Sequence, residues 1–97
     1  MDDVLRKRLE RREVLLGEVR LLLIEHLRLR REPDEIDPDA PLFGTGLGLD
    51  SLDAVELVVG LEARFGIRVP DAEVRTLRTV NRVVDLVELR GKERHVP

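Results

Sequence analysis

The apolar residues in the first third of the chain recur at helical spacing. They lie three or four positions apart in two adjacent rows: Leu16, Val19, Leu23 and Leu27, beside Leu15, Leu22 and Leu29. This spacing places side chains on one face of a helix. Acidic residues at positions 2 and 3 suit its start and arginines at 28, 30 and 31 its end, because those charges are favoured at the two ends of the helix dipole. We expect one long helix over residues 2–31, with residues 1–13 as a mostly charged helical extension outside the core.

Prolines and then glycines interrupt the regular pattern in the connection that follows. Its sequence is EPDEIDPDAPLFGTGLGLD, and its apolar residues are Ile36, Leu42, Phe43 and Leu47. Pro, Gly and Asp at this density favour turns over helix or strand. A loop this long in a small domain is usually functional or disordered. The apolar residues can anchor it in the core, so we expect an ordered loop.

The stretch after the loop predicts a second helix. Leu57, Leu61 and Phe65 form one apolar stripe at helical spacing. The helix should begin at residue 50 or 51, and Gly66 supplies a natural C-terminal stop.

The last third predicts a short and then a longer helix. Residues 67–69 read as extended, and Pro70 with the following Asp opens a short helical turn. Thr79 can cap a final helix over residues 80–90, which Gly91 is expected to end. The fold class is therefore all-α, a small bundle of four helices. The domain is expected to span residues 14–91, followed by a flexible tail over 92–97.

Composition narrows the kinds of chemistry open to this chain. Its 97 residues suffice for one domain, and its 42% hydrophobic content includes only two aromatic residues, so the core must be aliphatic. The absence of Cys excludes disulfides, thiolate metal sites and thiol nucleophiles. The two histidines, His26 and His95, have no metal-site spacing. No apolar run reaches membrane-span length and no signal-peptide pattern is present, so we expect a soluble cytoplasmic domain. We also expect it to be a monomer.

Charge is distributed in blocks along the sequence. Residues 33–63 contain eight acidic and no basic residues, a net charge of −8, whereas the flanking segments are net positive. Such a block is usually a solvated surface. It can also attract basic partners, and it would repel nucleic acid.

The only serine of the chain, Ser51, lies inside this acidic block. A hydroxyl nucleophile needs a general base and usually an orienting group, and neither histidine is well placed for that role. The carboxylates of Asp50, Asp53 and Glu56 share one exposed face with no apolar pocket to separate their pKa values, and they make no dedicated metal site. An N-terminal helix cap is the structural alternative for Asp50, Ser51 and Asp53.

Residues 46–70, GLGLDSLDAVELVVGLEARFGIRVP, resemble the acyl carrier protein family. The family signature is a D-S-L core that opens an acidic second helix, and both DSLDAVEL and the later FGIRVP match it. The resemblance covers roughly residues 14–90 and implies the same order of helices.

The resemblance implies that Ser51 carries a 4′-phosphopantetheine arm transferred from coenzyme A, which holds acyl cargo as a thioester. The protein would then be a carrier rather than an enzyme. The implied partners are a phosphopantetheinyl transferase, a ketosynthase and acyl or malonyl transferases, through a basic-to-acidic interface. The implied recognition surface is Asp50, Leu52, Asp53, Val55, Glu56, Val59 and Glu62. An implied acyl-chain site, for which plain core packing is the alternative, is Leu57, Leu61, Phe65, Val69, Val74 and Leu77.

The sequence departs from bulk fatty-acid carriers at the end of the second helix and in the loop that follows. Residues that are acidic there are replaced by Ala63, Arg64, Gly66, Arg68 and Arg75. These replacements, together with the loop sequence PLFGTGLGLDS, favour a dedicated carrier of a secondary pathway of the type II polyketide or aryl polyene kind. A peptidyl or D-alanyl carrier, and a non-catalytic acidic interaction module that uses the long first helix as a dimer seam, remain as alternatives.

Overall fold

The structure, a computed structural model, describes residues 2–94, with the side chains of residues 2–91. The elements follow in the order α1 (Asp3–Leu27), the 3-10 turn η1 (Pro33–Glu35), α2 (Ser51–Phe65), α3 (Asp71–Val74) and α4 (Val80–Arg94). Over the described residues no strand forms, although two isolated bridges join loop residues. The prediction of a small all-α bundle with four helices is confirmed.

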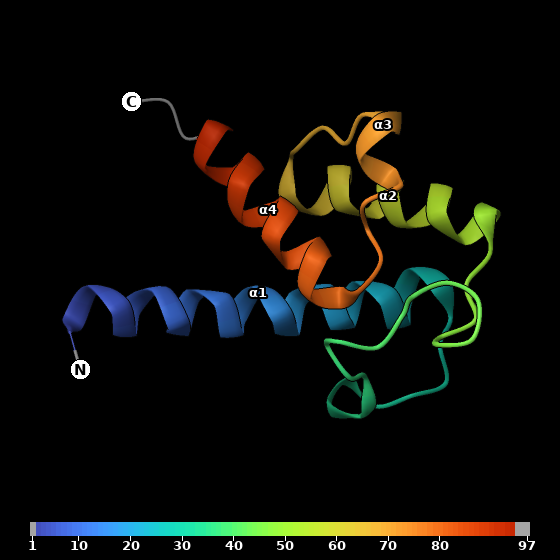
Figure 1. Ribbon diagram of the computed structural model, residues 1–97, viewed down its shortest axis with the longest axis horizontal. Coiled ribbons are helices and arrows are strands. Elements are labelled where there is room, and N and C mark those ends of the chain that lie inside the picture. Colours follow the sequence, from blue (N-terminus) through green and yellow to red (C-terminus); the bar gives the residue numbers. More distant parts are fainter. Residues whose placement is uncertain (1, 95–97) are drawn as a thin grey trace.

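Helices α2 and α4 and the turn η1 all pack against helix α1 (Figure 1). Its 25 residues extend about 38 Å at the usual helical rise, close to the longest dimension of the molecule, 39 Å. Helices α2 and α4 lie against its C-terminal part, and α3 lies beside α2 on the side away from α1. None of the helices between residues 2 and 94 is both long and apolar enough to cross a membrane.

The core between these helices is aliphatic, as the composition predicts. Among residues 2–91, no polar or charged residue is buried as a whole. The fully buried side chains come from every part of the domain: Val19, Leu22, Leu23, Ile36, Leu42, Leu57, Leu61, Leu77, Val80, Val83 and Val84.

The long loop is ordered, as expected, because two of its apolar residues are buried in this core. Ile36 and Leu42 have no exposed surface. The backbone N–H of Leu42 donates to the carbonyl of Arg78 at 2.8 Å, and the Arg20 Nε donates to the carbonyl of Ile36 at 3.0 Å. The loop is thereby attached to α1 and to the start of α4, and it delivers the chain to the beginning of α2.

The end of α1 differs from the prediction. The helix was expected to reach Arg31 but ends at Leu27, because Arg28 adopts a left-handed backbone conformation with φ of 54°. Leu29 then packs against the core. A straight continuation would carry the chain away from the bundle, whereas Ile36 has to return to it. The favourable interaction of the arginines with the end of the helix dipole was not enough to outweigh the burial of Leu29 and Ile36.

The end of α4 also differs. Gly91 was expected to end the helix, but α4 continues to Arg94. Gly91 has no positive φ, and a glycine within a helix costs only about 1 kcal/mol relative to alanine. Of the predicted tail, residues 92–94 have helical backbone and 95–97 lie outside the described residues.

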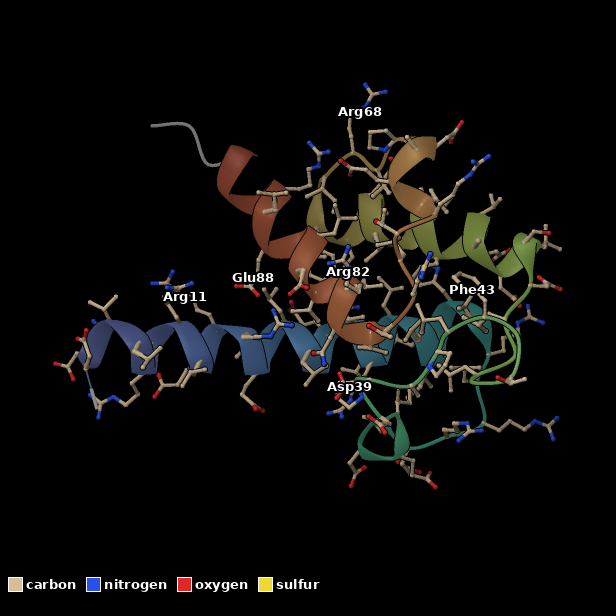
Figure 2. The ribbon with its side chains drawn as sticks, in the orientation of Figure 1. Arg11, Asp39, Phe43, Arg68, Arg82 and Glu88 are labelled. Atoms are coloured by element: carbon tan, nitrogen blue, oxygen red, sulfur yellow. The ribbon has the colours of Figure 1, made fainter. Side chains whose placement is uncertain are left out.

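Arg12 links the N-terminal half of α1 to α4. Arg12 forms ion pairs with Asp85, at 2.8 Å, and with Glu88, and it also donates to the side-chain oxygen of Asn81 at 3.2 Å. Figure 2 shows Glu88 on the side of α4 that faces α1, and Arg11 in the open angle between the two helices.

Candidate functional site

Ser51 is the first residue of α2, and its neighbours satisfy the backbone there. Asp50 is the N-cap, and its Oδ1 accepts a hydrogen bond from the Asp53 N–H at 2.9 Å. The Asp53 Oδ2 accepts one in return from the Asp50 N–H, also at 2.9 Å. This reciprocal pair is a capping box. Ser51 takes no part in it, and its exposed side chain makes no hydrogen bond with the residues that the structure describes.

The capping box explains why the serine is available. A serine at the N-cap position, one residue earlier, often serves as the cap. Here two carboxylates do so, and the Ser51 hydroxyl faces solvent at the positive end of the α2 dipole. The local sequence therefore builds an exposed, unengaged hydroxyl at a place that favours an added anion.

Most of the expected recognition residues surround this hydroxyl on the exposed face of α2. The apolar ones are conspicuously open to solvent, with Leu52 70%, Val55 59% and Val59 57% exposed. Asp50 and Glu56 are exposed as well. Exposed apolar residues next to carboxylates are typical of a surface that binds a partner.

Two of the expected recognition residues have structural contacts instead of full exposure. Asp53 is half-buried by its part in the capping box. Glu62 is half-buried too, and its Oε2 accepts a hydrogen bond from the Val69 N–H at 2.9 Å. Glu62 therefore fixes the segment between α2 and α3.

Two grooves meet at Ser51. The first, the α2–α3 groove, has a volume of about 370 Å³ and is lined by Ala54, Val55, Val58, Val59 and Val74 together with Ser51, Asp71 and Arg75. The second, the loop-side groove, has a volume of about 330 Å³ and is lined by Phe43, Leu49, Asp50, Ser51, Ala54, Val74 and Arg75. An arm attached to Ser51 could lie in either groove without displacing the core.

The six residues of the expected acyl-chain site lie in or against the core. Leu57, Leu61, Val69 and Leu77 are buried, while Phe65 and Val74 are half-buried and pack against them. Packing by itself accounts for this burial, so the acyl-chain role stays a prediction. Val74 differs from the other five because it also lines both grooves beside Ser51.

Within the part of the chain that the structure describes, no histidine lies within hydrogen-bond reach of Ser51. The imidazole of His26 packs against Gly60, with a ring carbon 3.3 Å from the position of an added Cβ. Gly60 is nine residues along α2 from Ser51, which corresponds to about 13 Å, well beyond hydrogen-bond reach. His95 lies outside the described residues. Within residues 2–94 no group of three or more potential ligands could hold a metal ion.

Comparison with known proteins shows the family to which this chain belongs. Residues 19–87 match the family described as the phosphopantetheine attachment site. A protein named acyl carrier protein from Campylobacter hominis is 40% identical over 77 residues, covering 79% of this chain and 94% of the relative. The chain belongs to the acyl carrier protein family.

Two further acyl carrier proteins are similar to this chain to about the same extent. The one from Sulfurovum sp. is 38% identical over 74 residues, covering 76% of this chain and 95% of the relative. The one from Thermosynechococcus vestitus is 37% identical over 73 residues, covering 75% of this chain and 86% of the relative. Membership of this family implies a 4′-phosphopantetheine prosthetic group and makes the protein a carrier rather than an enzyme.

The site has the features that this prosthetic group requires. It offers an unengaged hydroxyl, a helix N-terminus suited to a phosphodiester, and grooves of mostly apolar lining on both sides. The carrier also has no cysteine, so a working thiol has to come from a cofactor.

Sequence reasoning missed part of the site. Ala54, Val58 and Asp71 line the α2–α3 groove, and Arg75 lines both grooves. Arg75 had been noted only as a basic residue in a place where related carriers are acidic. Its closeness to Ser51 depends on how α3 packs against α2, which no local pattern specifies.

Proposed function

We propose that Ser51 carries the 4′-phosphopantetheine arm, and that this carrier presents acyl intermediates to a series of biosynthetic enzymes. The observation that supports this most directly is the exposed hydroxyl of Ser51, left free by the Asp50–Asp53 capping box at the point where two grooves meet. When attached, the arm supplies the thiol that holds the cargo as a thioester.

The helix N-terminus favours the modified state. Transfer from coenzyme A forms a bond between the Ser51 Oγ and the phosphorus of phosphopantetheine, breaks the pyrophosphate bond of coenzyme A and releases adenosine 3′,5′-bisphosphate. The serine hydroxyl loses its proton, and a phosphodiester with one negative charge remains at the start of α2. The free N–H groups and the helix dipole stabilise a charge at that position, typically by 0.3–1 kcal/mol at an exposed site.

The partner enzymes should recognise the surface around the arm. We assign Asp50, Asp53 and Glu56, with Glu62 further along α2, to attract basic residues of the partners. Leu52, Val55 and Val59 provide apolar contacts, supported by their exposure. A small interface dominated by charge allows fast binding and release, which a carrier needs between steps. The transferase, a ketosynthase and acyl or malonyl transferases are the partners we expect, in the cytoplasm.

We further infer that the carrier serves a specialised pathway of the polyketide or aryl polyene type. The support is the basic character of the surface beyond the acidic face, where Arg64, Arg68 and Arg75 are all exposed. A malonyl transferase or ketosynthase of bulk fatty-acid synthesis should then load or elongate it more slowly than the cognate enzymes do. Equal kcat/KM values with both sets of enzymes would contradict this assignment.

The functional domain in this proposal is residues 14–91, which includes the stretch matched by the family. Acyl chains would be held between the helices by the core residues named above. An aliphatic core with few rings can deform to admit a chain more readily than one filled by large aromatic side chains.

Intact mass spectrometry tests the attachment directly. The carrier is incubated with coenzyme A and a broad-specificity phosphopantetheinyl transferase, with Ser51→Ala in parallel. We expect the unmutated chain to gain one phosphopantetheine and the variant none. If a control carrier is modified and this chain is not, the proposal is wrong.

A further inference from the structure

Both grooves beside Ser51 include the same basic residue. Arg75 caps the C-terminal end of α3 and lines the α2–α3 groove and the loop-side groove, as Ser51 does. Its side chain is exposed, and it forms no ion pair with any residue that the structure describes. The other arginines near α2 and α3 line neither groove. Arg75 is thus an unpaired cation at the point where the two grooves meet.

A phosphodiester on Ser51 would lie among carboxylates. Asp50 is adjacent in the chain, Asp53 lies one half-turn along the helix, and Asp71 lines the α2–α3 groove. The N–H groups of Asp50 and Asp53 already donate within the capping box, so they are not available to the phosphate. The free N–H groups of Ser51 and Leu52 remain for the phosphate, and a cationic side chain from outside the first turn of α2 would add to their stabilisation of the charge.

We propose that Arg75 binds the phosphodiester of the phosphopantetheine arm on Ser51 and so holds the start of the arm where the two grooves meet. A guanidinium group presents planar, paired N–H donors that match two phosphate oxygens. Ala54 and Val74, the other residues common to both grooves, have apolar side chains and do not compete for the phosphate. This inference rests on the proposed attachment at Ser51 and adds a binding residue to it.

The test uses the phosphorus-31 resonance of the full-length carrier after modification. Four forms are compared: the unmutated chain, Arg75→Gln, Arg75→Lys and the matched control Arg68→Gln. Arg68 is exposed, lines neither groove, and points away from the molecule in Figure 2. Mass spectrometry first establishes that each form carries the arm, and circular dichroism that each is folded.

We expect Arg75→Gln to move the phosphorus resonance and Arg68→Gln to leave it unchanged, with Arg75→Lys in between. In 1 M NaCl, where the Debye length is about 3 Å, the resonance of the unmutated carrier should move toward that of Arg75→Gln. The difference in Tm between the modified and the unmodified form should be smaller in Arg75→Gln than in the unmutated chain, by about 1–4 °C, as expected for an exposed ion pair.

A second readout needs no variant. In the unmutated chain, the Nε–Hε resonance of Arg75 should shift on modification by more than that of Arg68. If neither this resonance nor the phosphorus resonance distinguishes Arg75 from Arg68 in the modified carrier, the inference is overturned while attachment at Ser51 stands. If the unmutated chain accepts no phosphopantetheine, the proposed function fails and takes this inference with it.

Discussion

At the scale of single residues, the helix cap at the start of α2 is formed by residues other than Ser51. Asp50 and Asp53 each accept a hydrogen bond of 2.9 Å from the other's backbone N–H, and the Ser51 side chain, our proposed attachment point, takes no part in this cap. The helix end can therefore stay intact whether or not the serine is modified. This division predicts that the cap contributes to stability and the serine does not.

Replacing Asp50 with Ala should lower the free energy of unfolding by about 1 kcal/mol, the usual contribution of an N-cap side chain. Asp50→Asn should retain most of it, because an amide oxygen can also accept the N–H. Urea denaturation measures both. Glu56→Ala, on the same face but outside the cap, is the control and should stay within about 0.5 kcal/mol of the unmutated chain. An equal loss in both Ala variants would contradict the capping role.

Two glycines in different environments give a second prediction at this scale. An added Cβ at Gly46 would lie 1.7 Å from the Pro41 carbonyl oxygen, whereas at Gly17, inside α1, it would meet nothing within 4 Å. Gly46→Ala should therefore destabilise the fold by about 2 kcal/mol or more. Gly17→Ala should stabilise it by about 0.5–1 kcal/mol, because alanine loses less entropy in a helix. Thermal unfolding of the two variants should show shifts of opposite sign.

At the scale of the elements, the N-terminal turns of α1 are attached to α4 by Arg12. Burial by itself lowers the pKa of this guanidinium, but the hydrogen bonds and charges of Glu88 and Asp85 together raise it above its ordinary value. A raised pKa in the folded state means that the guanidinium's contribution to stability is complete below the ordinary pKa. It would be lost only as the pH rises through the raised value, so Arg12 stays charged and bound throughout the neutral range.

Arg12→Ala should lower the free energy of unfolding by about 1 kcal/mol, since its side chain is 32% exposed and meets two carboxylates at once. The loss should be smaller in 1 M NaCl because salt screens the pairs. Arg6→Ala is the matched control from the same helix. Its pair with Asp3 joins residues that are 59% and 76% exposed, so it should change stability by less than about 0.5 kcal/mol. The denaturant guanidinium chloride is itself a salt and would screen the ion pairs, so unfolding should be measured in urea.

At the scale of the whole molecule, the loop between α1 and α2 closes the end of the bundle that contains Ser51. Ile36 and Leu42 are completely buried, and the N–H of Asn81 at the start of α4 donates to the Pro38 carbonyl at 3.0 Å. The loop is therefore part of the core and sets where α2 begins. Stability and partner recognition then depend on different apolar residues.

Ile36→Ala should lower the free energy of unfolding by about 2–5 kcal/mol, the range for a large-to-small change in a core. Leu52→Ala, at a side chain that is 70% exposed, should change it by less than about 0.5 kcal/mol. The effects on function should be the opposite. Leu52→Ala should raise the KM of partner enzymes, and the folded Ile36→Ala variant should leave this KM unchanged. Denaturation curves and transferase kinetics on the two variants provide the comparison. A stability loss at Leu52 as large as that at Ile36 would contradict this separation.

The amino-acid sequence alone was sufficient for several features that depend on near neighbours, although it did not predict the 3-10 turn η1. The helical spacing of Leu57, Leu61 and Phe65, the left-handed C-cap at Gly66 with φ of 64° and the Thr79 cap, whose Oγ1 accepts the Arg82 N–H at 3.2 Å, could all be predicted. So could the exposed serine at the start of α2. These features rest on contacts between residues three or four positions apart, and such contacts can be read from spacing and residue type.

Only the tertiary structure decided the features that join distant parts of the chain. It ended α1 at Leu27 so that the loop could return to the core, let α4 pass through Gly91, and bound Arg12 to side chains some seventy positions away. It also brought Arg75 and Ser51 to the edges of the same two grooves. Long-range contacts form only after the loops have closed. Their geometry depends on how the whole core packs, and no short stretch of sequence specifies that packing.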